Sequence, residues 1–262
     1  DRFVHEPGAG ADEVNDFSVT SDILDLSAHA FALLALALAT ASDLAEGVRF
    51  DFGGGDSVLL LGVSKLDLDA DVSRYLGFSL RNPHFPERAI TLQHLLTHRA
   101  SLRDDAGYSF PAGTSLKDFI TPGARLYDKG AMWASKAGPG DYFTYCNLGW
   151  GLIGTLMERV TNERFDRLMR RLLLAPLGLT AGYNPAALAP AALDNLATLY
   201  RKRTVDTEVW DASGPWIAQA DDYRSKPASP PPGIERYVIG DNATPFSPTG
   251  GLRVTARDLG TL

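Results

Sequence analysis

The spacing of hydrophobic and polar residues differs between the two ends of the chain. Up to about residue 65, short apolar runs such as RFV (2–4) and VLLL (58–61) are separated by glycine and aspartate, which is typical of short β-strands joined by turns. Residues 28–44 are rich in alanine and leucine and are too continuous for a strand, so they predict a helix. Residues 1–65 are therefore expected to form a β-rich segment with one helix.

From residue 71 onward the pattern changes to amphipathic helices broken by proline and glycine loops. Residues 91–97 begin with a threonine that can cap a helix and carry leucines on one face. Residues 148–160 and 163–174 form an amphipathic pair, and the last helix is expected to follow Thr255, with Asp258 placed as in a capping box. The two patterns together predict an α+β protein whose body, residues 66–262, is mainly helical.

Length and composition are those of a folded protein. The chain has 262 residues, of which 45% are hydrophobic and 22% charged, enough for one large domain or two ordinary ones. A formal charge of −7 and an isoelectric point near 5.2 argue against a nucleic-acid partner, which needs clustered lysine and arginine. Cys146 is the single cysteine, so an internal disulfide and a thiolate zinc cluster are excluded.

The most apolar run is FALLALALA at residues 31–39. It is far shorter than the roughly 20 residues that cross a bilayer, so no membrane span is expected. Acidic residues precede it where a signal peptide has a basic region, which argues against a secretory signal peptide. Because the sequence starts without methionine and stops abruptly at Leu262, we expect it to be a fragment.

A turn rich in glycine near the N-terminus suggests a calcium site. Residues 8–14, GAGADEV, fit the second half of the nonapeptide GGxGxDxUx, in which glycines permit tight turns and aspartate supplies an oxygen ligand. Residues 53–56, GGGD, give a degenerate second copy. The candidate calcium residues are therefore Gly8, Gly10, Asp12 and Asp56. The alternative is an ordinary turn, because stacked copies are needed to complete a coordination sphere.

The N-terminal segment also resembles a known family. Residues 1–71 are similar to the terminal part of repeats-in-toxin calcium-binding proteins, with a FVxEPGxGAD turn and two strand pairs, DFSVTSDILDLS and DFGGGDSVLLLGVS. In that family the segment caps a β-roll and accompanies secretion. The resemblance implies bound calcium and a secreted protein.

Five later segments resemble, in order and approximate spacing, the serine β-lactamase and penicillin-binding-protein-like hydrolases. They are LDLDADVSRYL at 66–76, ITLQHLLTHRASL at 90–102, FTYCNLGWGLIG at 143–154, APLGL at 175–179 and SPTGGL at 247–252. The second is closely like the family's ITxxHLLTHxSGL segment, and the third holds its Tyr-x-Asn motif. The resemblance implies the β-lactamase/transpeptidase-like fold, here with an incomplete sheet.

The same resemblance implies acyl transfer on an amide or ester. In such chemistry a serine attacks the carbonyl, a neighbouring base takes its proton, and backbone N–H groups hold the oxyanion. Tyr145 would be the proton-relaying phenol and Asn147 a contact to the substrate amide, whereas the alternative for Tyr145 is a half-buried aromatic side chain whose hydroxyl is satisfied by a hydrogen bond. No cofactor is implied. The substrate would be a small acyl compound (a β-lactam, a D-amino-acid peptide or an ester), and the location periplasmic or secreted.

The nucleophile pair of this family, Ser-x-x-Lys, is missing from the sequence. Residues 62–65, GVSK, have glycine in the place of the serine. Ser21 is the remaining nucleophile candidate, although Leu24 stands where lysine would be. The family's third motif is expected beyond Leu262.

Cys146 lies inside the Tyr-x-Asn motif, so a cysteine nucleophile has to be considered. Such a nucleophile needs a histidine within hydrogen-bond reach, and the resemblance places His94 and His98 on a packing helix. We therefore expect Cys146 to be a small buried thiol.

Several interpretations stay open. The first is a truncated or degenerate serine hydrolase. The LDLDAD segment fits both the N-terminal pattern and the pattern of the body, so a splice at this segment would make the chain a chimera. The second is a non-catalytic secreted module that binds calcium or a partner. Missing strands would leave an apolar face uncovered, so we expect oligomers or aggregates.

Overall fold

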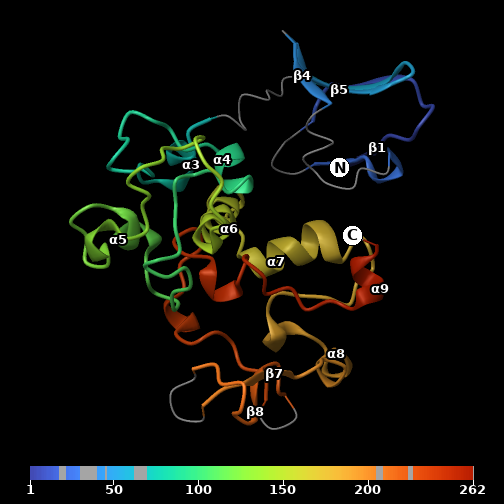
Figure 1. The fold of residues 1–262 in the computed structure, drawn as a ribbon. Helices are drawn as coiled ribbons and strands as arrows, with labels where there is room; N and C mark the ends of the chain where they lie inside the picture. The colour runs from blue at the N-terminus through green and yellow to red at the C-terminus, as the bar shows by residue number, and fades with distance from the viewer. Residues whose placement is uncertain are drawn as a thin grey trace.

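The computed structural model describes residues 1–17, 22–29, 40–44, 46–61, 70–204, 209–223 and 227–261. The described helices are α3 (Ser73–Leu76), α4 (Leu92–Leu96), α5 (Leu116–Ile120), α6 (Asn147–Thr161), α7 (Phe165–Met169), α8 (Pro190–Asp194) and α9 (Ala256–Leu259). The described strands are β1 (Arg2–Val4), β2 (Ala11–Val14), β3 (Ile23–Asp25), β4 (Ala41–Asp43), β5 (Gly47–Gly53), β6 (Asp56–Leu61), β7 (Leu199–Lys202) and β8 (Trp216–Ala220). In Figure 1 the first six strands form a group of their own beside the helices.

The N-terminal strands make two small sheets. β1 pairs with β3 in parallel, and a second sheet has the order β2-β6-β5-β4, in which β2 and β6 are parallel. Val14, Val58 and Leu60 are buried there, with phenylalanine rings packed against them. The alternation of short apolar runs with glycine and aspartate therefore predicted strands correctly at both ends of this segment.

The helix predicted at residues 28–44 lies mostly outside the described residues. Its last part was wrong, because Ala41–Asp43 is strand β4 and pairs antiparallel with β5. These residues form backbone hydrogen bonds with β5. Helix propensity depends on the local sequence alone, so it does not include the contribution of a neighbouring strand.

The predicted helices of the body are observed. α4 has Thr91 as its N-cap, and a capping box joins Thr91 to His94: the Thr91 Oγ1 accepts from the His94 N–H at 3.2 Å. The predicted pair is α6 followed by α7, which continues as a π-helical turn over Arg170–Leu174. α9 is capped by Thr255, whose Oγ1 accepts from the Asp258 N–H at 3.0 Å.

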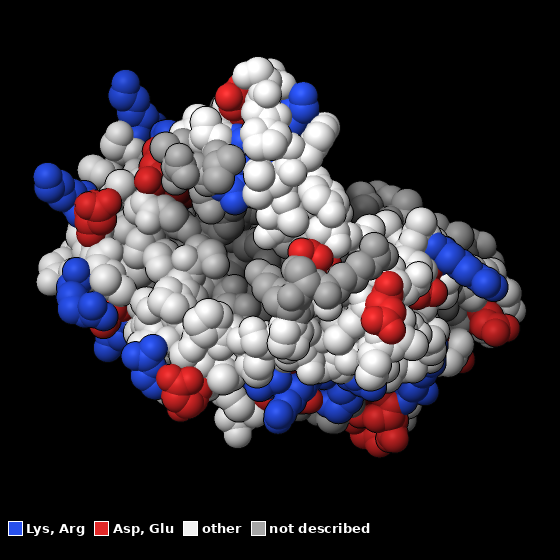
Figure 2. Space-filling view, turned by 90° about the horizontal axis from the view of Figure 1, so that it is seen from below, with Lys and Arg blue, Asp and Glu red and all other residues white. Residues whose placement is uncertain are grey.

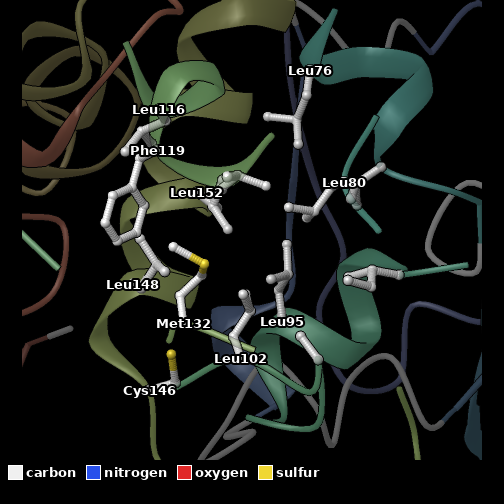
Figure 3. Close-up of a cluster of buried hydrophobic side chains, with 14 of the residues drawn as sticks. Leu76, Leu80, Leu95, Leu102, Leu116, Phe119, Met132, Cys146, Leu148 and Leu152 are labelled. Carbon is white, nitrogen blue, oxygen red and sulfur yellow. The ribbon is translucent and has the colours of Figure 1, made fainter. Parts of the chain in front are cut away.

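α6 is the central element of the helical core. Figure 3 shows Leu148 and Leu152 projecting from it among Leu95, Leu116 and Met132. These side chains are fully buried, together with others from α3, α4, α5 and the loops between them. The apolar stripe of α6 thus organises the packing of the whole body.

Glycines in α6 allow a later segment to approach the helix closely. A Cβ at Gly151 would lie 2.7 Å from the Thr244 Cγ2, and a Cβ at Gly154 would lie 2.5 Å from the Pro248 Cγ. Helix propensity disfavours each glycine by about 1 kcal/mol relative to alanine. The close packing of residues 242–248 against α6 explains why glycine stands at these positions.

Glu158, a fully buried residue of α6, ties this helix to two other parts of the chain. Its carboxylate accepts from the Phe165 N–H at 2.7 Å, from the Gly240 N–H at 2.9 Å and from the Tyr237 hydroxyl. Burial raises the pKa of the Glu158 carboxyl, and the three donors act in the opposite direction without cancelling this effect. Burial and the neighbouring Glu158 also raise the pKa of Tyr237.

We expect the free energy of unfolding to depend on pH through Glu158. Its pKa is higher in the folded chain than the ordinary 4.5, so the stability it contributes is fully present below that value and is lost as the pH rises through the folded-state pKa. Glu158→Gln removes the titrating group. Urea unfolding of both proteins from pH 4 to 8 should show the wild type losing stability relative to the variant; a difference that does not change with pH would contradict this assignment.

Candidate active site

The start of α6 is capped by a carboxylate from another part of the chain. The Asp104 Oδ2 accepts from the Asn147 N–H at 2.9 Å and from the Asn147 Nδ2 at 2.8 Å. The Asp104 Oδ1 accepts from the Leu148 N–H at 3.0 Å and from the Cys146 Sγ at 3.3 Å. A helix N-terminus has free N–H groups and a partial positive charge, so a carboxylate is favourable there.

The protonation state of Asp104 follows from these contacts. Burial acts to raise the pKa of the Asp104 carboxyl, but the N–H donors of Asn147 and Leu148 together outweigh it, so the pKa lies below its ordinary value. Asp104 is therefore a carboxylate at neutral pH and accepts at every contact.

Tyr145 and Asn147, both predicted site residues, are brought together. The Tyr145 hydroxyl donates to the Asn147 Oδ1 at 3.3 Å, and the Tyr145 side chain is 59% exposed. Because the Asp104 carboxylate can only accept, Asn147 turns its Nδ2 toward Asp104 and its Oδ1 toward Tyr145. The site thus presents a phenol hydroxyl, with one defined partner, at the surface of the protein.

His98 packs directly against this pair. Its ring centroid lies 4.6 Å from that of Tyr145, and its Nδ1 accepts from the Cys146 N–H at 3.1 Å. The prediction that His98 lies on a packing helix was wrong, since α4 ends at Leu96. His98 takes a left-handed backbone conformation, with φ of +56°, which carries its ring to the start of α6.

Cys146 is a buried thiol, as predicted. Burial raises the pKa of the Cys146 thiol to about 12, and the Asp104 carboxylate acts in the same direction. A thiol with this pKa contains almost no thiolate at neutral pH and is a poor nucleophile. His98 contacts the backbone nitrogen of Cys146, so the geometry supports a structural part for this cysteine.

The nucleophile candidates lie elsewhere in the sequence. Ser21 and residues 62–65 are outside the described residues. Leu24, in the position of the family's lysine, belongs to strand β3. The described part of the site therefore consists of a proton-carrying phenol, an amide and the residues that hold them.

The structure also brings together three of the four candidate calcium residues. The Gly8 and Gly10 N–H groups donate to the Asp56 carboxylate at 2.6 and 3.1 Å, and these donors hold the pKa of Asp56 below its usual value. Both glycines have positive φ, as a tight turn requires. The Asp12 Oδ2 lies 3.6 Å from the His5 Nε2 instead.

Among the described residues, no group of three or more His, Cys, Asp or Glu side chains is arranged to hold a metal ion. Calcium binding, which depends on oxygens from a stack of turns, remains a prediction. Within the same residues, no helix has the length and apolar character to cross a membrane. On the face that Figure 2 shows, the described lysines and arginines lie mixed with aspartates and glutamates rather than gathered into one basic area.

Comparison with known proteins places the chain in a family. A family model described as Beta-lactamase matches residues 33–262. The chain belongs to the Beta-lactamase family. The match begins earlier than the resemblance that we noted from residue 66, and it crosses the predicted boundary between residues 65 and 66. The division into two domains, 1–65 and 66–262, remains a prediction, as does the resemblance to repeats-in-toxin proteins.

The curated relatives match under half of the chain. Penicillin-binding protein 4 of Amycolatopsis lactamdurans is 29% identical over 121 residues, which are 46% of this chain and 30% of the relative. A Beta-lactamase of Providencia stuartii is 30% identical over 119 residues, or 45% of this chain and 28% of the relative. The matched part of the chain thus spans less than a third of either relative.

Among solved structures, the octameric penicillin-binding protein homologue from Pyrococcus abyssi is similar at 20% identity and a TM-score of 0.45, over 74% of this chain and 37% of that one. Family membership rests on the family model, and the α+β architecture on the elements described above. The prediction of a β-lactamase-like hydrolase family is confirmed.

Asp104 and His98 are the site residues that sequence reasoning did not assign. His98 belongs to the ITLQHLLTHRASL segment at residues 90–102, and Asp104 lies two residues after its end. The available signal was the order of the family-like segments along the chain. Residues 90–102, which closely resemble the family, come directly before the segment that holds the Tyr-x-Asn motif. Which side chains connect the two could not be read from the order alone.

Proposed function

We propose that this chain is an acyl-transfer hydrolase acting on amides or esters, with Tyr145 as its proton relay and Asn147 as a substrate contact. The observation that carries the proposal is the exposed Tyr145 hydroxyl, held 3.3 Å from the Asn147 Oδ1 at the capped start of α6. Membership of the Beta-lactamase family supports it.

The chemistry follows from what these groups can do. A phenol hydroxyl facing solvent can give a proton to, or take one from, a reacting group within hydrogen-bond reach. The Asn147 Nδ2 has two hydrogens, of which Asp104 takes one, so the other can donate to a substrate carbonyl. A donor aimed at the carbonyl oxygen stabilises the negative charge that develops there during acyl transfer.

We further propose that turnover is slow, as in a truncated or degenerate enzyme, because the sequence lacks Ser-x-x-Lys. Residual binding and oxyanion stabilisation still accelerate such reactions when the nucleophile unit is incomplete. β-Lactams, D-amino-acid peptides and small esters are the proposed substrates, and a periplasmic or secreted location is part of the same proposal.

The test is a panel of chromogenic substrates: nitrocefin, p-nitrophenyl acetate and a D-alanyl p-nitroanilide. We expect release above the buffer rate for at least one of them, in proportion to protein concentration and with saturation. Rates equal to buffer for all three would overturn the proposal.

Light scattering of the same samples tests the expectation of oligomers, since large apolar side chains such as Trp210 and Trp216 are well exposed.

A second candidate is a calcium-binding module. It is supported by two parallel strand pairs, β1 with β3 and β2 with β6. The chain passes from β1 to β2 through a turn in which Gly8 and Gly10 have positive φ. Titration calorimetry with CaCl₂ tests it. Heat of binding accompanied by a higher unfolding temperature would favour this function, and no heat at millimolar calcium would set it aside.

A further inference from the structure

We infer that Asp104 is a positioning residue, which fixes the orientation of the Asn147 amide and thereby the partner of the Tyr145 hydroxyl. The inference rests on the proposed function, because Tyr145 and Asn147 are its working groups. It goes further by assigning a specific task to a carboxylate outside the Tyr-x-Asn motif.

The first support is the number of donors that share this carboxylate. Two backbone N–H groups of α6, the Asn147 side-chain amide and the Cys146 thiol all donate to Asp104, at 2.8 to 3.3 Å. A carboxylate accepts at both oxygens, whereas an asparagine in its place would present an NH₂ group to some of these donors. The pattern of donors therefore requires an ionised carboxyl.

The second support is the consequence for Asn147. An asparagine side chain offers an oxygen on one side and an NH₂ group on the other. With the Nδ2 held 2.8 Å from the Asp104 Oδ2, the Oδ1 is turned toward Tyr145 and accepts its hydroxyl. If the amide were reversed, the Tyr145 hydroxyl would lose the oxygen to which it donates. Asp104 thus acts on the phenol through Asn147.

The third support is that the backbone between Tyr145 and Leu148 is held at successive residues. His98 Nδ1 accepts from the Cys146 N–H, and Asp104 accepts from the next two N–H groups. His98 and Asp104 both lie in the segment that follows α4. The working groups are consequently fixed by a neighbouring segment as well as by their own helix.

The chain supplies a matched control in the next residue. Asp105 has the same charge, but its side chain is 58% exposed and pairs with Arg103 at 2.8 Å. Asp104→Asn and Asp105→Asn therefore remove the same charge one residue apart, and Asp104 alone is bonded to the start of α6. Any effect of net charge should appear in both variants.

The experiment compares the two variants with the wild type by two readouts. NMR follows the Asn147 side-chain amide, assigned through its disappearance in Asn147→Asp, and stopped-flow labelling with a fluorescent penicillin or an activated ester gives the acylation rate. In Asp104→Asn we expect the amide signals to shift and exchange faster, and the acylation rate to fall roughly 10- to 100-fold at saturating probe, as a misplaced group does. Asp105→Asn should match the wild type in both.

The outcomes separate the inference from the proposed function. A folded Asp104→Asn protein with wild-type amide signals and the rate of Asp105→Asn would overturn the inference. A wild type that no probe acylates would overturn the proposed function, while the NMR comparison would still decide whether Asp104 orients Asn147. If Asp104→Asn does not fold, Asp104→Glu takes its place: it keeps the charge but moves the carboxylate, and unchanged Asn147 amide signals would equally overturn the inference.

Discussion

Replacing Tyr145 by phenylalanine is expected to lower the acylation rate by roughly 10²- to 10⁴-fold, the range over which a positioned acid–base group contributes. The substitution removes the hydroxyl that donates to the Asn147 Oδ1 and leaves the ring that packs on His98. Since the side chain is largely exposed, the free energy of unfolding should change by less than about 0.5 kcal/mol. Stopped-flow labelling measures the rate, and thermal unfolding checks the fold.

Tyr142→Phe is the control for this experiment. Tyr142 lies three residues earlier and is 68% exposed, and the hydroxyl that donates to the Asn147 Oδ1 is that of Tyr145, so Tyr142→Phe removes an exposed phenol hydroxyl and leaves this hydrogen bond in place. The control should keep the wild-type acylation rate within about twofold, as surface changes usually do. Equal rates in Tyr145→Phe and Tyr142→Phe would show that Tyr145 has no part in proton transfer.

The largest loss of stability is expected from Leu152→Ala. Leu152 is 0% exposed and lies in the middle of the core cluster that Figure 3 shows. Removing a buried leucine side chain costs about 2–5 kcal/mol, from lost burial and from the cavity left behind. Urea unfolding monitored by circular dichroism gives this value directly.

Val160→Ala, on the same helix, is the comparison. Val160 is 45% exposed near the end of α6, so its truncation should cost less than about 1 kcal/mol. If both variants lost the same stability, α6 would not be the centre of the core. Because Asn147 begins this helix, a strongly destabilised Leu152→Ala protein should also lose acylation at temperatures where it unfolds.

The elements that sequence reasoning predicted best carry their signal locally. Thr91 and Thr255 cap helices within three residues of themselves, and the apolar period of residues 148–160 is internal to α6. By contrast, β4 exists because Ala41–Asp43 pairs with β5, and that pairing depends on a partner strand rather than on local composition. Its alanine and neighbouring leucines therefore pointed to a helix.

The same distinction applies to the site. Tyr145 and Asn147 were predicted because a short motif contains both. The carboxylate that orients Asn147 lies more than forty residues away, at Asp104, and the ring beside Tyr145 comes from His98 through a left-handed turn. Neither a periodic pattern nor a spacing rule encodes such contacts; they become evident when the segment after α4 is folded against the start of α6.

The measurement that tests the central claim most directly is intact-mass spectrometry of the wild-type protein after incubation with a labelled penicillin and, in parallel, with p-nitrophenyl acetate. Because the sequence lacks Ser-x-x-Lys, the account predicts slow addition of one acyl group per chain, with Ser21 as the candidate serine for peptide mapping, and far slower addition in Tyr145→Phe. No adduct under either condition, or an adduct that forms equally fast in Tyr145→Phe, would contradict the claim that Tyr145 and Asn147 form the centre of an acyl-transfer site.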